Sequence, residues 1–180
     1  MNPTPLRIVS PDLPDLFAPF PTDDQPNFEL IPPALVPQPY HRLLVHQHHM
    51  TVTVEAYHGD RVNVRILNRI HEEPFYSRKI LLALEKTGKI VQFGIVRVNL
   101  DYCSQPVRER ILEGRTPFGR ILIEHKVLRR IEPTAYLRVK CGHAQRRWFG
   151  LEMPAPLFGR LAIIHCNGHP AVELLEIVAP

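Results

Sequence analysis

Two charged side chains lie within apolar segments of the sequence and are the first candidates for chemistry. Arg78 precedes the apolar run ILLAL, and Glu176 lies in the run LLEIVA close to the C-terminus. Burying an unpaired charge costs free energy, so a guanidinium at the edge of a core needs an anion. The two residues could form an internal ion pair. Alternatively, Arg78 could bind a ligand carboxylate through two parallel hydrogen bonds.

The obvious histidine cluster is formed by His46, His48 and His49. Imidazoles at such spacing can bind zinc or another divalent metal. A catalytic metal usually needs three well-placed protein ligands, and no acidic residue falls within the cluster to complete the set. We therefore interpret the cluster as a histidine-rich helix end at the surface and expect no metal.

The residues around the serines and cysteines give little indication of a hydroxyl or thiol nucleophile. Ser77 and Ser104 lack the glycine pattern of a nucleophile elbow and have no adjacent base. Cys103, Cys141 and Cys166 are odd in number and widely spaced, unlike a disulfide framework or a zinc site. Buried reduced thiols are the expected state.

Length and composition indicate one globular unit. The chain has 180 residues, of which 44% are hydrophobic and 22% charged, close to the average for globular proteins. Its longest apolar runs fall far short of the roughly 20 residues that span a bilayer. The N-terminus lacks the basic start and apolar stretch of a secretory signal. We expect no membrane partner and a cytoplasmic location.

Charge is unevenly distributed along the chain. Residues 1–40 contain one arginine and five acidic residues and so carry a charge of −4, whereas the whole chain carries +4. The remainder of the chain therefore carries +8. A basic body could attract nucleic acid, a membrane surface or a small anion. The basic residues are scattered, with Arg129-Arg130 and Arg146-Arg147 the only adjacent arginine pairs. This scatter predicts no nucleic-acid partner.

Proline divides the chain into an arm and a domain. Eleven of the 19 prolines lie in residues 1–40, which should therefore sustain neither a helix nor a central strand. Scattered apolar residues suggest that this extended arm lies against the domain formed by residues 41–180.

The pattern along residues 41–180 alternates between the periods of strands and helices. Residues 40–48 could form one or two helical turns, and 50–57 read locally as a strand because β-branched residues alternate. Strands are predicted at 61–70, 77–85, 89–100, 126–140 and 160–178, the last broken by the turn Asn167-Gly168, and short helices at 107–114 and 118–126. Strands joined by hairpins, with helices grouped between them, indicate an α+β fold with an antiparallel sheet. No GxGxxG or P-loop sequence is present.

Four segments taken together resemble the chorismate lyase family and its relatives catalogued as domains of unknown function. They are Met50-Thr51, the arginine-bearing stretch 77–82, the TPFGR sequence at 116–120, and Glu176 four residues before the last residue. The resemblance implies six antiparallel strands with helices on one side and a ligand enclosed beneath helical flaps. That family also has a helix ending near the Met50 position, so residues 50–57 could instead be helical.

The resemblance implies a chorismate pyruvate-lyase, which converts chorismate to 4-hydroxybenzoate and pyruvate without a metal or redox cofactor. Arg78 would pair with the ring carboxylate, helped by backbone N–H groups of Met50 and Phe118, and Glu176 would meet the 4-hydroxyl. A related fold serves as the effector-binding module of bacterial transcription regulators. The alternative is therefore a noncatalytic sensor that binds a small aromatic or cyclic carboxylate.

Overall fold

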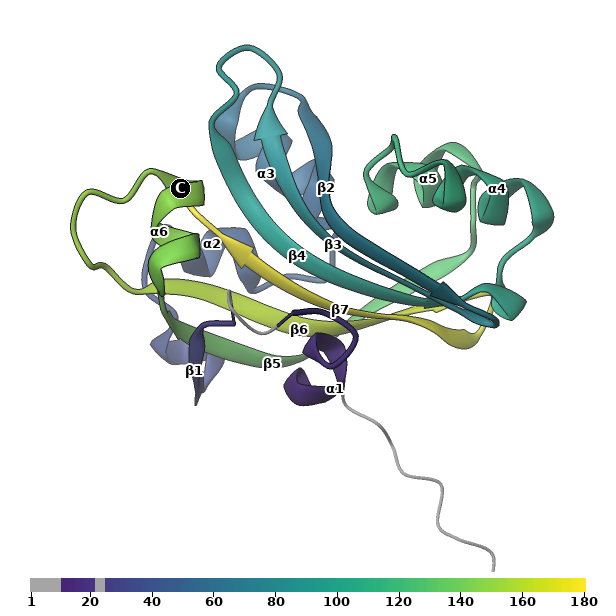
Figure 1. The fold of residues 1–180 in the computed structure, drawn as a ribbon, viewed down its shortest axis with the longest axis horizontal. Coiled ribbons are helices and arrows are strands. Elements are labelled where there is room, and N and C mark those ends of the chain that lie inside the picture. Colours follow the sequence, from purple (N-terminus) through teal and green to yellow (C-terminus); the bar gives the residue numbers. More distant parts are fainter. Residues whose placement is uncertain (1–10, 22–24) are drawn as a thin grey trace, which may run out of the picture.

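The fold is built on one antiparallel sheet of seven strands, ordered β1-β5-β6-β7-β4-β3-β2 (Figure 1). The computed structural model describes residues 11–21 and 25–180. The strands are β1 (Asn27–Ile31), β2 (Val62–Glu72), β3 (Phe75–Leu84), β4 (Ile90–Asn99), β5 (Arg129–Lys140), β6 (Leu157–Cys166) and β7 (His169–Val178). The predicted α+β class with an antiparallel sheet is confirmed, with seven strands where six were expected.

Within the described residues, six α-helices and two short 3₁₀ turns accompany the sheet. They are α1 (Leu13–Phe17), η2 (Pro33–Leu35), α2 (Tyr40–Leu44), α3 (Met50–His58), η3 (Leu100–Tyr102), α4 (Gln105–Glu113), α5 (Phe118–Glu124) and α6 (His143–Phe149). Across residues 11–21 and 25–180, no helix is long and apolar enough to cross a membrane.

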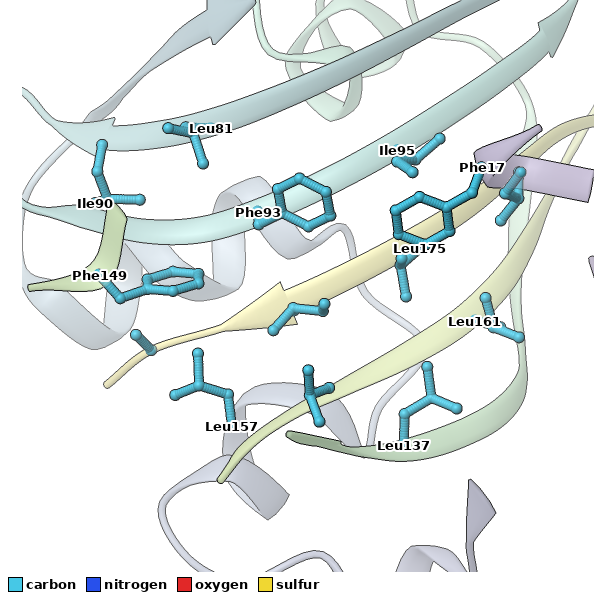
Figure 2. Packing of buried hydrophobic residues seen from close by; sticks show 14 of the residues in the cluster. Phe17, Leu81, Ile90, Phe93, Ile95, Leu137, Phe149, Leu157, Leu161 and Leu175 are labelled. Atoms are coloured by element: carbon cyan, nitrogen blue, oxygen red, sulfur yellow. The ribbon is translucent and has the colours of Figure 1, made fainter. Parts of the chain in front are cut away.

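One face of the sheet is covered by α1 and α6, which lie in front of the strands in Figure 1. Phe17 of α1 and Phe149 of α6 pack onto Phe93, Leu81 and Leu175 (Figure 2). Because successive side chains of a strand point to opposite faces, these odd-numbered positions on β3, β4 and β7 belong to one apolar surface. This core contains no candidate site residue.

The opposite face carries the even-numbered positions and is covered by the other four helices. Leu43 of α2 and Val54 of α3 belong to one buried cluster over Ile80, while Ile111 of α4 and Ile121 of α5 belong to a second. Arg78 and Glu176 share the parity of Ile80 and therefore lie on this face.

The helix α3 contradicts the local prediction of a strand at residues 50–57. Met50 and Val54 are both buried, and their four-residue spacing places them on the same side of a helix. Packing of that side outweighs the β-branched composition, whose helix propensity is only modestly unfavourable. The helix ends at Gly59 in the left-handed conformation (φ 63°), which glycine adopts without penalty.

The proline-rich N-terminal segment is more structured than predicted. Residues 1–10 and 22–24 of the predicted arm lie outside the described residues. The prediction that prolines exclude a helix is wrong for α1, because Pro14 lies in the first turn, where a helix needs no N–H donor. β1 pairs with β5 at the edge of the sheet. The division of the chain at residue 40 stays a prediction.

Candidate ligand-binding site

A small enclosed cavity of about 40 Å³ lies between the sheet and the N-terminal ends of α3 and α5. All four predicted site residues line it, namely Met50, Arg78, Phe118 and Glu176. The other lining residues include His49, Thr51, Val64, Ile80, Leu82, Gln92, Gly94, Val96, Pro117, Gly119, Ile164 and Leu174. This volume accommodates on the order of two or three water molecules, so a larger ligand requires the covering helices or side chains to move.

The cavity exists because Gly94 lies at the centre of its floor. Gly94 is paired with Ile80 on β3 and with Glu176 on β7, so these three residues form one row across the sheet. A Cβ at position 94 would lie 3.2 Å from the Leu175 carbonyl oxygen and 3.5 Å from Ile80 Cδ1. A side chain here would fill the space that the neighbouring side chains enclose.

Arg78 is a buried cation whose hydrogen-bonding capacity is mostly unused. The residue is 1% exposed, and its Nη2 donates to the Thr116 carbonyl at 3.2 Å. Its Nε and Nη1 have no hydrogen-bond partner within residues 11–21 and 25–180. Burial lowers the pKa of Arg78 from its usual value, and the neighbouring Tyr76 partly opposes this shift. Arginine nevertheless stays charged near neutral pH, so the unpaired donors favour an anion.

Glu176 does not pair with Arg78, because a second buried arginine holds it. Nε of Arg160 donates to Glu176 Oε2 at 2.7 Å, and Arg160 is 1% exposed. The two residues lie opposite each other on β6 and β7. Arg160 also donates to the carbonyl oxygens of Leu44, His46 and His48, at 3.2, 2.8 and 3.1 Å. The ion pair thus anchors the segment between α2 and α3 to the sheet.

Arg160 was missed in the sequence, although its signal resembles that of Arg78. It stands in the run LFGRLAII as one charge among apolar residues of a central strand. The internal ion pair weighed for Glu176 does exist, but with Arg160 in place of Arg78.

The cover of the cavity consists of two helix ends in close contact. A Cβ on Gly119 would lie 3.1 Å from Thr51 Oγ1 and 3.2 Å from His49 Cβ, so α5 packs tightly against the start of α3. Met50 and Phe118 are the first residues of their helices. The first N–H groups of a helix have no intrahelical acceptor, which leaves these donors available to a ligand.

Of the histidine cluster, His49 belongs to this cover. Over the described part of the chain, no group of three or more His, Cys, Asp or Glu side chains is arranged to hold a metal ion. His49 Nε2 accepts a hydrogen bond from Arg129 Nε at 2.5 Å, and burial together with that guanidinium lowers the pKa of His49 to about 4. Burial and the nearby Arg160 likewise lower the pKa of His46 to about 4. Both imidazoles are neutral near pH 7.

These lowered pKa values predict that the fold loses stability as the pH falls below about 6.5. Below the unfolded pKa of about 6.5 the unfolded chain binds a proton at His49. The folded domain binds none until its pKa of about 4. The free energy of unfolding should therefore fall between these pH values, by roughly 2–3 kcal/mol for His49. Urea unfolding at a series of pH values measures this slope.

The variant His49→Gln should flatten the slope, because glutamine can still accept from Arg129 but does not titrate. His125→Gln is the matched control, since that side chain is exposed and outside the cavity. An unchanged slope in His49→Gln would contradict the assignment.

Known proteins share the fold of this chain but little of its sequence. No family model and no curated protein matches. A solved structure of PhnF from Mycobacterium smegmatis has a TM-score of 0.56 at 10% identity, covering 76% of this chain and 66% of that one. The effector domain of PhnF has a TM-score of 0.50 at 9% identity, covering 73% and 88%. This chain is similar in fold to an effector domain.

A further similar structure is the ligand-binding domain of a putative GntR-family transcriptional regulator from Bordetella bronchiseptica. Its TM-score is 0.48 at 13% identity, and the match covers 66% of this chain and 85% of that one. The chain spans slightly less than two thirds of the full PhnF protein.

These comparisons correct the prediction of a chorismate pyruvate-lyase. The fold is shared with the effector domain of PhnF, and this finding favours the alternative of a noncatalytic binding domain. No family model matches this chain, so the resemblance to the chorismate lyase family stays a prediction from the sequence. The structure also supplies a physical reason, because the carboxylate assigned to the reaction, Glu176, is held by Arg160.

Proposed function

We propose that this chain is a noncatalytic sensor domain that binds a small aromatic or cyclic monocarboxylate in the cavity beneath α3 and α5. The observation that carries the proposal is the Arg78 guanidinium, buried at 1% exposure with Nε and Nη1 unpartnered among the described residues. A carboxylate is the anion whose two oxygens match two guanidinium N–H groups. Backbone N–H groups of Met50 and Phe118 would help to hold it.

The buried charges favour a ligand with one negative charge. Arg160 and Glu176 neutralise each other, and His49 is uncharged near pH 7. Arg78 remains as the one uncompensated charge among the described residues at the cavity. A monoanion would balance it, whereas the dianion chorismate would bring an excess negative charge into a low-dielectric space.

The same charges favour binding over catalysis. General acid–base chemistry needs a titratable group that is free to exchange a proton with the ligand. The titratable side chains lining the cavity are His49, Arg78 and Glu176. His49 Nε2 is engaged by Arg129, and Glu176 is held by Arg160. A ligand would therefore be retained unchanged, as a sensor requires.

Isothermal titration calorimetry with 4-hydroxybenzoate and its neutral analogue 4-hydroxybenzamide tests this proposal. The carboxylate should bind at least about tenfold more tightly than the amide, because only the carboxylate forms charge-assisted hydrogen bonds with Arg78. Equal affinities would contradict the role of Arg78. Absence of binding by 4-hydroxybenzoate, benzoate and cyclohexanecarboxylate would contradict the ligand class.

A further inference from the structure

Gln92 is a second buried polar side chain at the cavity whose hydrogen bonding is incomplete. It lies on β4, is 5% exposed and lines the cavity. Its Oε1 has no hydrogen-bond partner in the part of the chain that the structure describes. Its Nε2 would lie 3.7 Å from a Cβ at Gly94, so the carboxamide reaches over the hollow floor. The amide can therefore donate to a ligand, accept from it, or do both.

The strand register places Gln92 far from Arg78 and near Glu176. Arg78 is opposite Val96 on β4, and Gln92 lies four residues from Val96 along that strand. This separation is about 14 Å, at roughly 3.4 Å per residue. Gln92 and Glu176 are instead diagonal neighbours, because Glu176 is opposite Gly94. The cavity therefore has a cationic end and a neutral polar end.

Apolar side chains line the cavity from the cationic end to its middle. Val96 and Leu174 lie in the same row across the sheet as Arg78, and Ile80 lies in the next row toward Gln92. They suit a ring or a short hydrocarbon skeleton. A ligand that spans the cavity thus meets a cation, an apolar middle and an amide in sequence.

We infer that Gln92 determines specificity by selecting a ligand with a neutral hydrogen-bonding group, such as a hydroxyl, opposite its carboxylate. The inference rests on the proposed function and narrows its ligand class to hydroxycarboxylates. A hydroxyl both donates and accepts, so it complements either end of the amide. A ligand without this group leaves Gln92 buried and unmatched, which costs binding free energy. Glu176 is less suited to this selection because Arg160 already satisfies its charge.

Calorimetric titration of the wild-type protein and Gln92→Met with 4-hydroxybenzoate and benzoate tests the inference. The wild type should bind 4-hydroxybenzoate about tenfold more tightly than benzoate, as one net hydrogen bond provides. Gln92→Met has a similar length and no polar atom to leave unmatched, so it should reduce the preference to within about twofold. Its benzoate affinity should be unchanged or higher.

The ratio of two affinities within one protein separates this effect from a distorted cavity, which would weaken both ligands together. A wild type without preference, or a variant with the full preference, overturns the inference and leaves carboxylate binding intact. Failure of the wild type to bind either ligand or cyclohexanecarboxylate overturns the proposed function as well. Gln92→Leu is a second variant with an apolar side chain at this position. Thermal unfolding verifies that each variant is folded.

Discussion

Replacing Arg78 with methionine should lower the affinity for 4-hydroxybenzoate at least about a hundredfold without destabilising the domain. Two charge-assisted hydrogen bonds to a carboxylate are each worth about 1.5–3 kcal/mol, and a hundredfold corresponds to about 2.7 kcal/mol. In the protein without ligand, Nε and Nη1 of Arg78 have no partner among the described residues. Removing an uncompensated buried cation should leave the free energy of unfolding unchanged or raise it. Calorimetry and urea unfolding measure the two quantities.

Two further variants test whether the loss of affinity is specific to the Arg78 guanidinium. Arg78→Lys keeps the charge but loses the planar fork, so its affinity should be intermediate. Arg97→Met is the matched control, because Arg97 pairs with Glu173 on the opposite face of the same sheet. It should bind 4-hydroxybenzoate as the wild type does. Loss of several kcal/mol of stability in Arg78→Met would instead show that the guanidinium supports the fold.

Replacing Arg160 with methionine should have the contrary effect and lower the free energy of unfolding by about 3–5 kcal/mol. The variant leaves Glu176 as an uncompensated buried carboxylate, which is the costly way to break a buried ion pair. It also removes the donor to the carbonyl groups of Leu44, His46 and His48. Such a loss is a large part of the 5–15 kcal/mol that typically stabilises a domain. Urea unfolding at pH 7 provides the measurement.

A double variant separates the charge from the carbonyl contacts. Arg160→Met combined with Glu176→Gln removes the unpaired carboxylate, so it should recover part of the lost stability. The fraction not recovered reports the anchoring of residues 44–48. If the double variant is no more stable than Arg160→Met, the buried charge of Glu176 is not the cause.

Periodicity predicted most of the fold because the strands and their turns are encoded locally. Residues 61–70, which alternate between apolar and polar, form β2 in the structure. The Asn167-Gly168 turn joins β6 and β7 in a hairpin. The helix α3 was not predictable from its own residues, because the burial of Met50 and Val54 depends on strands distant in sequence. The helix α6 was also missed, since HAQRRWF buries only Gln145 and Phe149 and has little apolar periodicity.

The candidate site was predictable at the residues where a charge interrupts an apolar run. Arg78 and Glu176 carried that signal, and the structure brings both to one cavity. Arg160 carried it too, but the choice of partner for Glu176 depends on the β6–β7 register, which is a tertiary property. Gln92 and Gly94 share a face of β4 by their two-residue spacing. Their importance emerges only when Gly94 is known to lie at the centre of the floor.

The close contact between the ends of α3 and α5 over the cavity affects the rates of ligand binding and release as well as the affinity. A carboxylate of ring size does not fit in about 40 Å³, so its entry requires the cover to move, and the contact of His49 and Thr51 with Gly119 is part of that cover. Association should therefore accelerate with ligand concentration only until this opening becomes the slow step. Because Arg160 hydrogen-bonds the chain up to His48, we expect the opening to begin just after that anchor. The same contact delays escape, so a bound ligand would have a long residence time for its size.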